Sequence, residues 1–554
     1  SVSFSSGGFG ARYGDRTSAV TNITLRDGSQ ERVSGELNLS ATGFGVIGEG
    51  PLGGNGSFLL SARRSYLDLI FKAAGFSFVP AYWDFQLKAT QRVDESSTLS
   101  FLTIGALNDI SFVNDDAEDR FDNSRILAPE QRQYFSGLTY QRSFERGYLA
   151  LTLGRTYTRF RTVQRDSLDP PQILFQSFST EGENSLRADL TLELSPRLTV
   201  AFGNVAKYAS ELDYDVTIPG DLRRDGRGTP QPLRVDTSFT AFRNATYAQG
   251  TWRFNRFKAT VGLRTDYYGF LRRSLRVAER VGLAFRVGRN SEVRLNRGRY
   301  HQAPSYIWLM GDPQNRDALE PIQATQIGLG FEHLFRPDLR LQMEAYHKSY
   351  RDYPARRFRP QAVLAPSGFE DVTNDIPFGL EPLVSEGTGR AFGLEMQVQK
   401  RQSATPLYGL LSLSLARSEF EGLDGEERPG AFDTRFIGTL LAGYRFNPAW
   451  ELSGKFRLAT GQPTTPFITS GPLIGTLDFS RYNDGGRLPT FHALDIRVDR
   501  RWSFSNWQLE VYLDVQNIYA RTNISQIRWN AQEQRVEDNE ALGILPSLGV
   551  NIEF

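Results

Sequence analysis

Apolar and polar residues alternate along much of this chain with a period of two. Residues 186–194 carry Leu or Ala at every even position, while Arg187, Asp189 and their neighbours occupy the odd ones. The same alternation returns in residues 198–206, 281–287, 392–398, 411–415 and 494–498. Successive side chains of a strand point to opposite faces, so the pattern predicts many strands that each have one apolar and one polar face.

The connections between these strands alternate between short and long. Short turns are predicted at residues 53–55, 94–97, 145–147, 195–197, 255–256, 288–291, 336–338, 402–405, 447–448 and 503–506. Longer polar segments lie between them, at residues 108–130, 162–181, 211–236, 353–386, 461–488 and 521–545. Transmembrane barrels have short periplasmic turns and longer extracellular loops. We therefore predict an all-β fold, a transmembrane antiparallel β-barrel of about 22 strands.

Composition is compatible with this fold and excludes others. Only 40% of the residues are hydrophobic and the mean hydropathy is −0.40, yet a barrel with alternating faces hides its membrane surface from such averages. The absence of cysteine argues against a disulfide framework or a cysteine metal site. A net charge of +1 without long runs of one sign gives no reason to expect a nucleic-acid partner.

The C-terminus carries a candidate signal for membrane insertion. Leu548, Val550, Ile552 and Phe554 alternate up to a terminal aromatic carboxylate. This ending resembles the last strand that the outer-membrane insertion machinery recognises, although an ordinary edge strand can also end in Phe. Aromatic residues gather beside the predicted turns, as in the girdles at the two membrane interfaces.

Residues 7–28 resemble the end of the plug domain in TonB-dependent receptors, where a similar stretch precedes the first barrel strand. The residues that carry this plug-end motif are Gly8, Tyr13, Gly14, Asp15 and Asn22. Residues 61–66, 389–395, 494–498 and 515–519 are similar to barrel segments of the same family.

The resemblance implies a C-terminal end of a plug with its linker at residues 1–31, and a barrel at residues 32–554. It implies uptake of a siderophore, vitamin, peptide or glycan fragment across the outer membrane of a Gram-negative bacterium. If the full-length protein carries a TonB box, the TonB–ExbB–ExbD complex would supply the energy by pulling on it. Residues 1–554 contain neither this box nor most of the plug; we expect both to precede residue 1, and a barrel with little plug is the alternative. Further implied partners are outer-membrane lipid, lipopolysaccharide and other outer-membrane or surface lipoprotein subunits.

The polar segments offer little sign of catalysis, a cofactor or a metal. The four histidines are scattered, and no nucleophile elbow or phosphate-binding loop is present, so we expect neither an enzyme nor a bound cofactor. The acidic residues 114–122 lack the spacing of a known calcium loop, and a solvated loop is the simpler interpretation, with Ca²⁺ left open. Ligand recognition is expected in the long loops. The candidates are Arg356, Arg357, Phe358 and Arg359.

Two other functions remain open at this stage. The barrel could act as a scaffold or docking subunit of a larger outer-membrane complex, without active transport. It could also be a passive porin, which the plug-like N-terminal segment and the predicted strand number disfavour.

Overall fold

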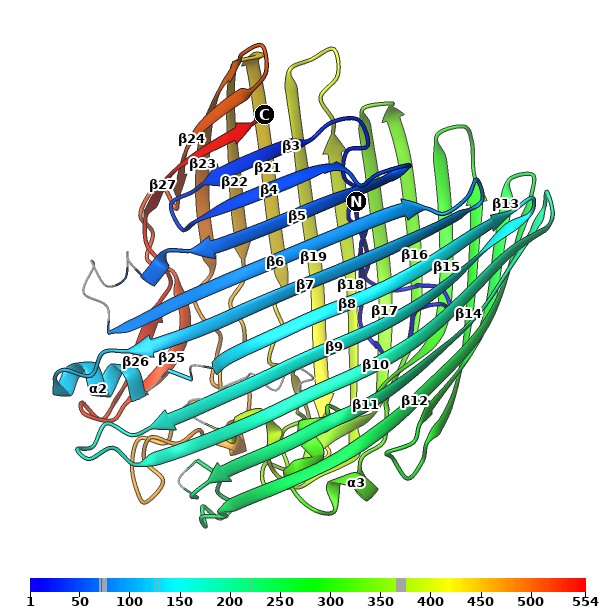
Figure 1. The fold of residues 1–554 in the computed structure, drawn as a ribbon. Helices are drawn as coiled ribbons and strands as arrows, with labels where there is room; N and C mark the ends of the chain where they lie inside the picture. The colour runs from blue at the N-terminus through cyan, green and yellow to red at the C-terminus, as the bar shows by residue number, and fades with distance from the viewer. Residues whose placement is uncertain (69–70, 72–76, 125, 128, 221, 365–374) are drawn as a thin grey trace.

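In the computed structural model, hydrogen bonds between antiparallel neighbours carry the sheet around a full circle (Figure 1). The structure describes residues 1–68, 71, 77–124, 126–127, 129–220, 222–364 and 375–554. Within this part of the chain, 22 strands form the closed barrel, with the short β20 added beside β19. The predicted fold class and strand number are therefore confirmed.

The wall strands follow one another in chain order. They are β3 (Ser34–Leu39), β4 (Gly43–Pro51), β5 (Gly56–Ser65), β6 (Phe78–Arg92), β7 (Ser97–Phe112), β8 (Pro129–Phe144), β9 (Gly147–Arg165), β10 (Ile173–Ser195), β11 (Leu198–Ile218), β12 (Leu233–Phe254), β13 (Phe257–Tyr268), β14 (Leu275–Arg286), β15 (Ser291–Gln302), β16 (Ile322–Arg336), β17 (Leu339–Arg356), β18 (Leu383–Lys400), β19 (Leu407–Glu421), β20 (Glu427–Pro429), β21 (Phe436–Asn447), β22 (Trp450–Ala459), β23 (Phe491–Ser503), β24 (Gln508–Gln516) and β27 (Leu545–Glu553).

The remaining elements lie inside the wall or in the long connections at one end of it. They are β1 (Val2–Ser5), β2 (Val20–Ile23), α2 (Ala117–Ser124), η1 (Tyr306–Met310), α3 (Asn315–Ala318), η2 (Pro377–Gly379), η3 (Phe479–Arg481), β25 (Ile524–Asn530) and β26 (Arg535–Glu540). The described residues include no helix that is both long and apolar enough to cross a membrane.

All ten predicted short turns connect neighbouring strands at one end of the barrel, which we call the turn end. The long connections lie at the opposite end, the loop end, where Figure 1 places α2 and α3. One loop prediction was wrong, because most of residues 162–181 belongs to β9 and β10. These strands of 19 and 23 residues exceed the 9–11 residues that cross a bilayer. Their ladder continues beyond the membrane as far as the pair Ile173–Arg165, where the alternation between a lipid face and a luminal face no longer marks the strands.

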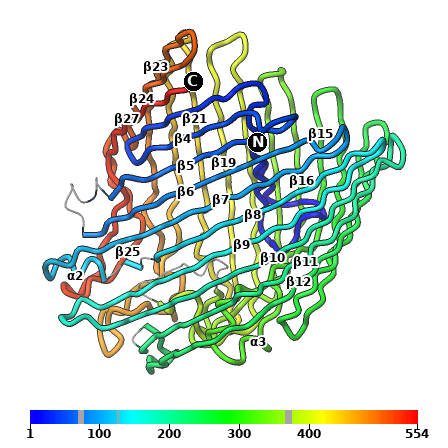
Figure 2. The backbone as a smooth tube through the Cα atoms, in the orientation of Figure 1, coloured from blue at the N-terminus to red at the C-terminus, as the bar shows by residue number. Residues whose placement is uncertain are grey.

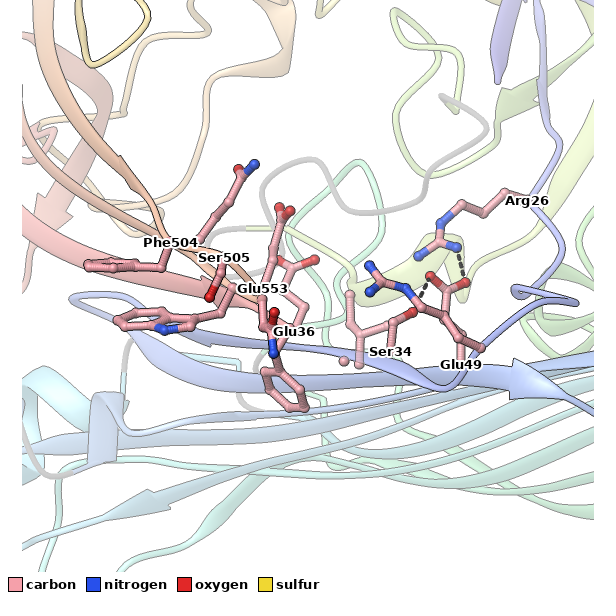
Figure 3. A pocket seen from close by; sticks show the side chains of 14 residues that line it. Arg26, Ser34, Glu36, Glu49, Phe504, Ser505 and Glu553 are labelled. Carbon is pink, nitrogen blue, oxygen red and sulfur yellow. Dashed lines mark hydrogen bonds and ion pairs between the residues drawn. The ribbon is translucent and has the colours of Figure 1, made fainter.

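The barrel closes where its last strand pairs with its first. Ile552 of β27 lies opposite Leu37 of β3. The backbone N–H groups of Phe554 and Gly35 each donate to the other residue's carbonyl at 2.9 Å. A polar cavity of about 440 Å³ lies beside this seam. Figure 3 shows Phe504 toward one end of it and the Arg26–Glu49 ion pair at the other.

The loop end contains its own apolar core. Side chains from β10, β11, η1, η2 and the connections around them pack together, and Trp308, Leu380 and Leu383 are almost completely buried. We call η1, α3, η2 and the strand ends packed against them the loop cap. This core lies apart from the lipid-facing wall.

The N-terminal segment lies within the barrel. Figure 2 traces it in dark blue inside the outline of the wall. β1 and β2 pair with each other, with Val2 opposite Ile23, and join no wall strand. The residues between them, 6–18, which we call the luminal segment, contact the inner faces of several wall strands. The proposed division between residues 31 and 32 stays a prediction; the first wall strand begins at Ser34.

Candidate functional site in the barrel lumen

Arg280 of β14 is the centre of the attachment between the wall and the luminal segment. Its guanidinium donates to the carbonyl oxygens of Phe9 at 3.2 Å, Tyr13 at 2.6 Å, and Gly10. It also lies 4.4 Å from the ring centroid of Tyr300 and 5.2 Å from that of Phe9. One buried cation therefore satisfies three carbonyls of a segment that has no regular structure of its own.

A second set of wall cations lies on the same side of the lumen. Arg264, paired with Asp266 at 2.9 Å, donates to the carbonyl oxygen of Ala11 at 3.1 Å. Arg243 pairs with Asp15 at 2.8 Å. Arg12 of the segment reaches Asp189 of the wall at 3.2 Å. Charges of both signs hold the segment, so the attachment does not depend on one residue.

The predicted plug-end residues occupy positions with specific steric demands. Gly8 has a φ of +63°, and a Cβ there would lie 2.7 Å from the Asn296 side chain. A Cβ on Gly14 would lie 2.1 Å from Arg264 Nε. Asp15 also has a positive φ, a conformation that Asp tolerates better than most residues. The close approach of the wall explains why glycine stands at two of these positions.

The other two motif residues have different surroundings. Tyr13 contributes its carbonyl oxygen to Arg280, as described above. Asn22 lies exposed in β2, opposite Ser3. The role of the five residues as a plug-end motif stays a prediction.

Lys348 of β17 ties the two ends of the luminal segment together. Its ammonium donates to the carbonyl oxygens of Ser6 at 2.6 Å and Ser18 at 3.1 Å. Neighbouring Gln326 donates to the carbonyl oxygen of Thr17. Lys348 is buried, so its charge is held in the lumen by these contacts.

An aromatic cavity lies next to this lysine, toward the loop cap. It measures about 260 Å³ and is bounded by Ser18, Lys348 and the aromatic side chains of β17, β19 and the loops. Tyr350 and Tyr353 pack against Phe420, with ring centroids 5.7 and 4.8 Å away. We call this cavity the luminal chamber. Its boundary includes the luminal segment itself.

A second cavity of about 270 Å³, the outer cavity, adjoins the luminal chamber. The two share Val363, Ala431, Phe432 and Tyr482 in their linings. Phe432 is 59% exposed, so its ring stands in the space between them rather than in a packed core.

The four predicted ligand-binding residues have different surroundings in the structure. Arg356 borders the outer cavity, but it is buried and paired at 2.6 Å with both Asp375 and Glu381. Burial raises the pKa of Glu381, and the nearby Arg356 opposes this effect. Phe358 packs against the loop-cap core, Arg359 lies over the Phe479 ring, and Arg357 is exposed. Their role in ligand binding stays a prediction, and residues 365–374 of this loop lie outside the described residues.

Two buried polar side chains connect the strands of the loop cap. Arg223 donates to the carbonyl oxygens of Leu380 at 2.7 Å and Gly311 at 3.0 Å. Asn315 donates to the carbonyl oxygen of Trp308 at 2.6 Å and accepts from the Leu383 N–H at 2.8 Å. These contacts join loops that are distant in sequence.

The acidic residues 114–122 form the start of α2 and the residues before it. Asp116 accepts from the Asp119 N–H at 2.8 Å, and Asn123 donates to the Asn114 side chain at 2.8 Å. Across the described residues, no three His, Asp or Glu side chains gather as a metal site would require. His333 and His492 instead form hydrogen bonds with Ser291 and Tyr519.

Sequence reasoning missed Arg280 and Lys348 as the principal contacts of the luminal segment. Both occupy inward positions of their strands, but the alternation is weak beside them, since Glu279 precedes Arg280 and His347 precedes Lys348. The local pattern also does not indicate which luminal cation meets residues 6–18.

Comparison with known proteins identifies a family that matches most of the chain. Residues 82–518 match the family described as TonB dependent receptor-like, beta-barrel. No curated protein matched the chain.

Three solved structures illustrate the shared fold. The FrpB iron transporter of Neisseria meningitidis is 16% identical with a TM-score of 0.72, and the match covers 100% of this chain and 87% of FrpB. The ferric enterobactin receptor PfeA of Pseudomonas aeruginosa is 12% identical with a TM-score of 0.71, covering 100% and 85%. The outer membrane transporter YddB of Escherichia coli is 11% identical with a TM-score of 0.70, covering 100% and 84%.

The family match spans most of the chain, and the barrel it describes is the one observed. The family and its fold are those of receptors and transporters rather than enzymes. Its members reside in the outer membrane of Gram-negative bacteria. This chain therefore belongs to the TonB-dependent receptor family and forms its outer-membrane β-barrel.

Proposed function

We propose that this protein takes up a small ligand that binds in the luminal chamber, between the luminal segment and the loop cap. The observation that carries the proposal is the position of Lys348. It borders the chamber while its ammonium holds the carbonyl oxygens of Ser6 and Ser18. A ligand in the chamber would meet the same side chain that restrains both ends of the segment.

The chamber lining favours a ligand with an aromatic face and negative charge. Tyr346, Tyr350 and Phe420 provide ring surfaces, while Lys348 provides a cation. Together with the outer cavity, the space is of the size that ligand pockets usually have. Arg356 belongs to the outer cavity, and its pairing with two carboxylates makes it a positioning residue for the lining.

The neighbours support a metal chelate as the first ligand class to examine. Their names describe an iron transporter, a ferric enterobactin receptor and a copper transporter. An anionic chelate with aromatic donors would suit the charges and rings of the chamber. Vitamin, peptide and glycan ligands remain alternatives for the same site.

In the proposed transport step, a pulling force would release the luminal segment from the wall. In this proposal, residues 1–31 are the end of the plug and residues 32–554 the barrel, with energy delivered through TonB–ExbB–ExbD. Force applied before Ser6 would reach the wall first at Lys348. Release of that lysine would loosen the chamber floor formed by Ser18.

A binding measurement tests this proposal. Outer membranes bearing the full-length protein are equilibrated with a ferric catecholate chelate, ferric citrate or Cu²⁺, and retained metal is measured by mass spectrometry. Phe432→Ala should lower retention of the bound chelate about tenfold, because it removes a ring that lines both cavities. Phe392→Ala is the matched control, since Phe392 is 40% exposed on the outer wall.

Lys348→Met separates binding from transport. We expect it to bind the anionic chelate more weakly, because a chamber cation is lost, and to lose energy-dependent accumulation in whole cells even at a chelate concentration that restores full binding. If Phe432→Ala and Phe392→Ala bind all three probes as the wild type does, the chamber is not the ligand site.

A further inference from the structure

Arginine is concentrated on one part of the turn end, the end of the barrel opposite α2 and α3 (Figure 1). Five neighbouring turns, from the one between β10 and β11 to the one between β18 and β19, each carry an exposed arginine in the turn or at the adjoining strand end. The short turns of such barrels face the periplasm. We call these residues the arginine arc; they are Arg197, Arg256, Arg289, Arg336 and Arg401.

The other turns of the rim have a different composition. Those between β4 and β5, β21 and β22, and β23 and β24 contain neither lysine nor arginine. The turn between β6 and β7 contains Asp94 and Glu95, and in the turn between β8 and β9 Glu145 stands beside Arg146. The positive charge of the turns is therefore confined to the ends of β10 to β19.

Most of the arc has no counter-charge from the wall. Among the described residues, Arg336 is the one member that pairs with a carboxylate, that of Asp338 at 3.5 Å. Asp338 lies closer to Lys400, at 2.6 Å, and 62% of the Arg336 side chain is exposed. Arg197 lies over an aromatic ring, with its guanidinium carbon 5.3 Å from the centroid of Phe254. The arc thus presents positive charge that is free to meet a partner.

Backbone hydrogen bonds hold neighbouring turns side by side. The N–H of Arg253 donates to the carbonyl oxygen of Arg197 at 2.7 Å, and that of Arg286 donates to Arg256 at 2.9 Å. The same type of bond recurs at the next two turns, at 2.8 Å in each case. Neighbouring strands are about 4.8 Å apart, so successive arginines begin about 10 Å apart and the arc extends over about 40 Å. The backbone that carries these charges is fixed before any partner arrives.

Membrane lipid does not account for the arc. Exposed apolar residues lie next to the turns on both halves of the rim. Phe254 and Phe335 beside the arc are 62% and 54% exposed, while Val93 and Phe446 away from it are 59% and 61% exposed. Lipid surrounds the whole barrel, and this apolar belt does so too. The arginines are confined to one side, so they match a partner that approaches from that side.

The length of the arc suits a folded protein. A domain of about 100 residues has a radius of gyration of about 13 Å, so its diameter is close to the length of the arc. A single small anion would meet only one or two of the arginines. Guanidinium groups bind carboxylates through paired hydrogen bonds, and complementary charges on two surfaces speed their association.

A luminal cavity of about 590 Å³ lies on the same side of the barrel. It is lined by residues 4–10 and by the inner faces of β12 to β19, the strands whose turns carry most of the arc. Lys258, two residues after Arg256, also lines it, so the cavity extends to the turn end. A protein on the arc would lie next to this cavity.

We propose that the arginine arc is the docking surface for a soluble periplasmic protein that presents an acidic face. Its carboxylates pair with the arginines of the arc, and it lies to one side of the barrel axis. The turns on the other half of the rim stay uncovered. This surface goes beyond the proposed uptake function, because it is at the opposite end of the barrel from the loop cap and its charges contact no residue of the luminal chamber.

The test places a photo-crosslinking residue in the full-length protein in its own outer membrane. It replaces Asn290 or Gln402 within the arc, or Asn55 or Asn506 on the other half of the rim; all four residues are exposed. We expect light to attach one soluble protein at Asn290 and Gln402, at least tenfold more than at Asn55 and Asn506. Mass spectrometry identifies the adduct, and its attachment site should lie among Asp and Glu residues.

The captured protein is then purified and titrated against the detergent-solubilised full-length barrel. Arg256→Gln/Arg289→Gln should weaken binding about fivefold, as expected when two exposed ion pairs are lost. The matched control is Arg227→Gln/Arg272→Gln, which removes the same charge from exposed positions at the loop end and should bind as the wild type does. Added salt should weaken the wild type toward the arc variant. Heat-modifiable migration on a gel confirms that each barrel is folded.

Four results would overturn the proposal. Equal crosslinking on the two halves of the rim, or no protein adduct at Asn290 and Gln402, would remove the docking surface. A phospholipid or a peptidoglycan fragment as the main adduct at these positions would identify a different anionic partner. Equal weakening by the two double variants would reduce the effect to net charge.

Discussion

The guanidinium of Arg280 contacts Phe9 in two ways, donating to its carbonyl oxygen at 3.2 Å and lying 5.2 Å from its ring centroid. Wall and luminal segment are thus joined by both a charge-assisted hydrogen bond and a cation–π contact. Arg280→Gln removes the positive charge and shortens the side chain. We expect amide hydrogen exchange of residues 9–13 to accelerate about tenfold, since a lost hydrogen bond to a charged group costs more than 1 kcal/mol.

Arg294→Gln is the matched control for this variant. Arg294 also faces the lumen, but it pairs with Glu292 and Glu332 of the wall. Faster exchange of residues 9–13 in both variants would mean that loss of any luminal cation loosens the segment, contrary to a specific role for Arg280.

We predict that the luminal segment can pack against Arg264 only if residue 14 has no side chain. A Cβ there would lie 2.1 Å from Arg264 Nε, so Gly14→Ala must displace Arg264 or the segment. We expect a cost of roughly 1–3 kcal/mol and faster trypsin cleavage after Arg12 and Arg16. Gly48→Ala, at a position with no atom within 4 Å of the new Cβ, should be cleaved at the wild-type rate.

Arg223 is predicted to hold the loop cap together. Arg223→Met keeps much of the side-chain volume but leaves the carbonyls of Leu380 and Gly311 without their donor. Each buried, unsatisfied group costs about 1–3 kcal/mol, so external protease should cut the loop-end connections in intact cells. The exposed Arg227 lies in the same connection, and Arg227→Met should behave as the wild type; equal cleavage of the two variants would contradict the prediction.

The sequence was most informative where one face of a strand meets lipid. Leu186 and Leu190 had to alternate with Arg187 and Asp189, because the two faces lie in different solvents. The strand number followed from counting the short and long connections between such strands. It was less informative beyond the membrane, where both faces of β10 meet water or protein and alternation no longer marks the strand.

The sequence predicted that the lumen is polar and charged, but not which luminal residues contact one another. Arg264 could be placed there from its position on β13, but its contact with Ala11 joins residues 253 positions apart. Nothing in the local pattern distinguishes it from Arg294, which faces the same lumen and holds only wall carboxylates. The burial of Arg356 was likewise hidden, since its partners Asp375 and Glu381 lie 19 and 25 residues further along the chain.

Phe554 allows barrel closure to be separated from recognition by the insertion machinery. Its backbone exchanges two hydrogen bonds with Gly35 across the seam, whereas the residue as a whole is 54% exposed. Phe554→Ala keeps the backbone and removes the ring; deletion of residue 554 removes both.

If Leu548, Val550, Ile552 and Phe554 act as an insertion signal, Phe554→Ala should assemble poorly in cells yet refold in lipid vesicles like the wild type. Deletion should slow refolding as well, because β3 and β27 then share fewer backbone bonds at their short seam. Heat-modifiable migration measures both processes, and normal assembly of Phe554→Ala in cells would show that the ring carries no signal.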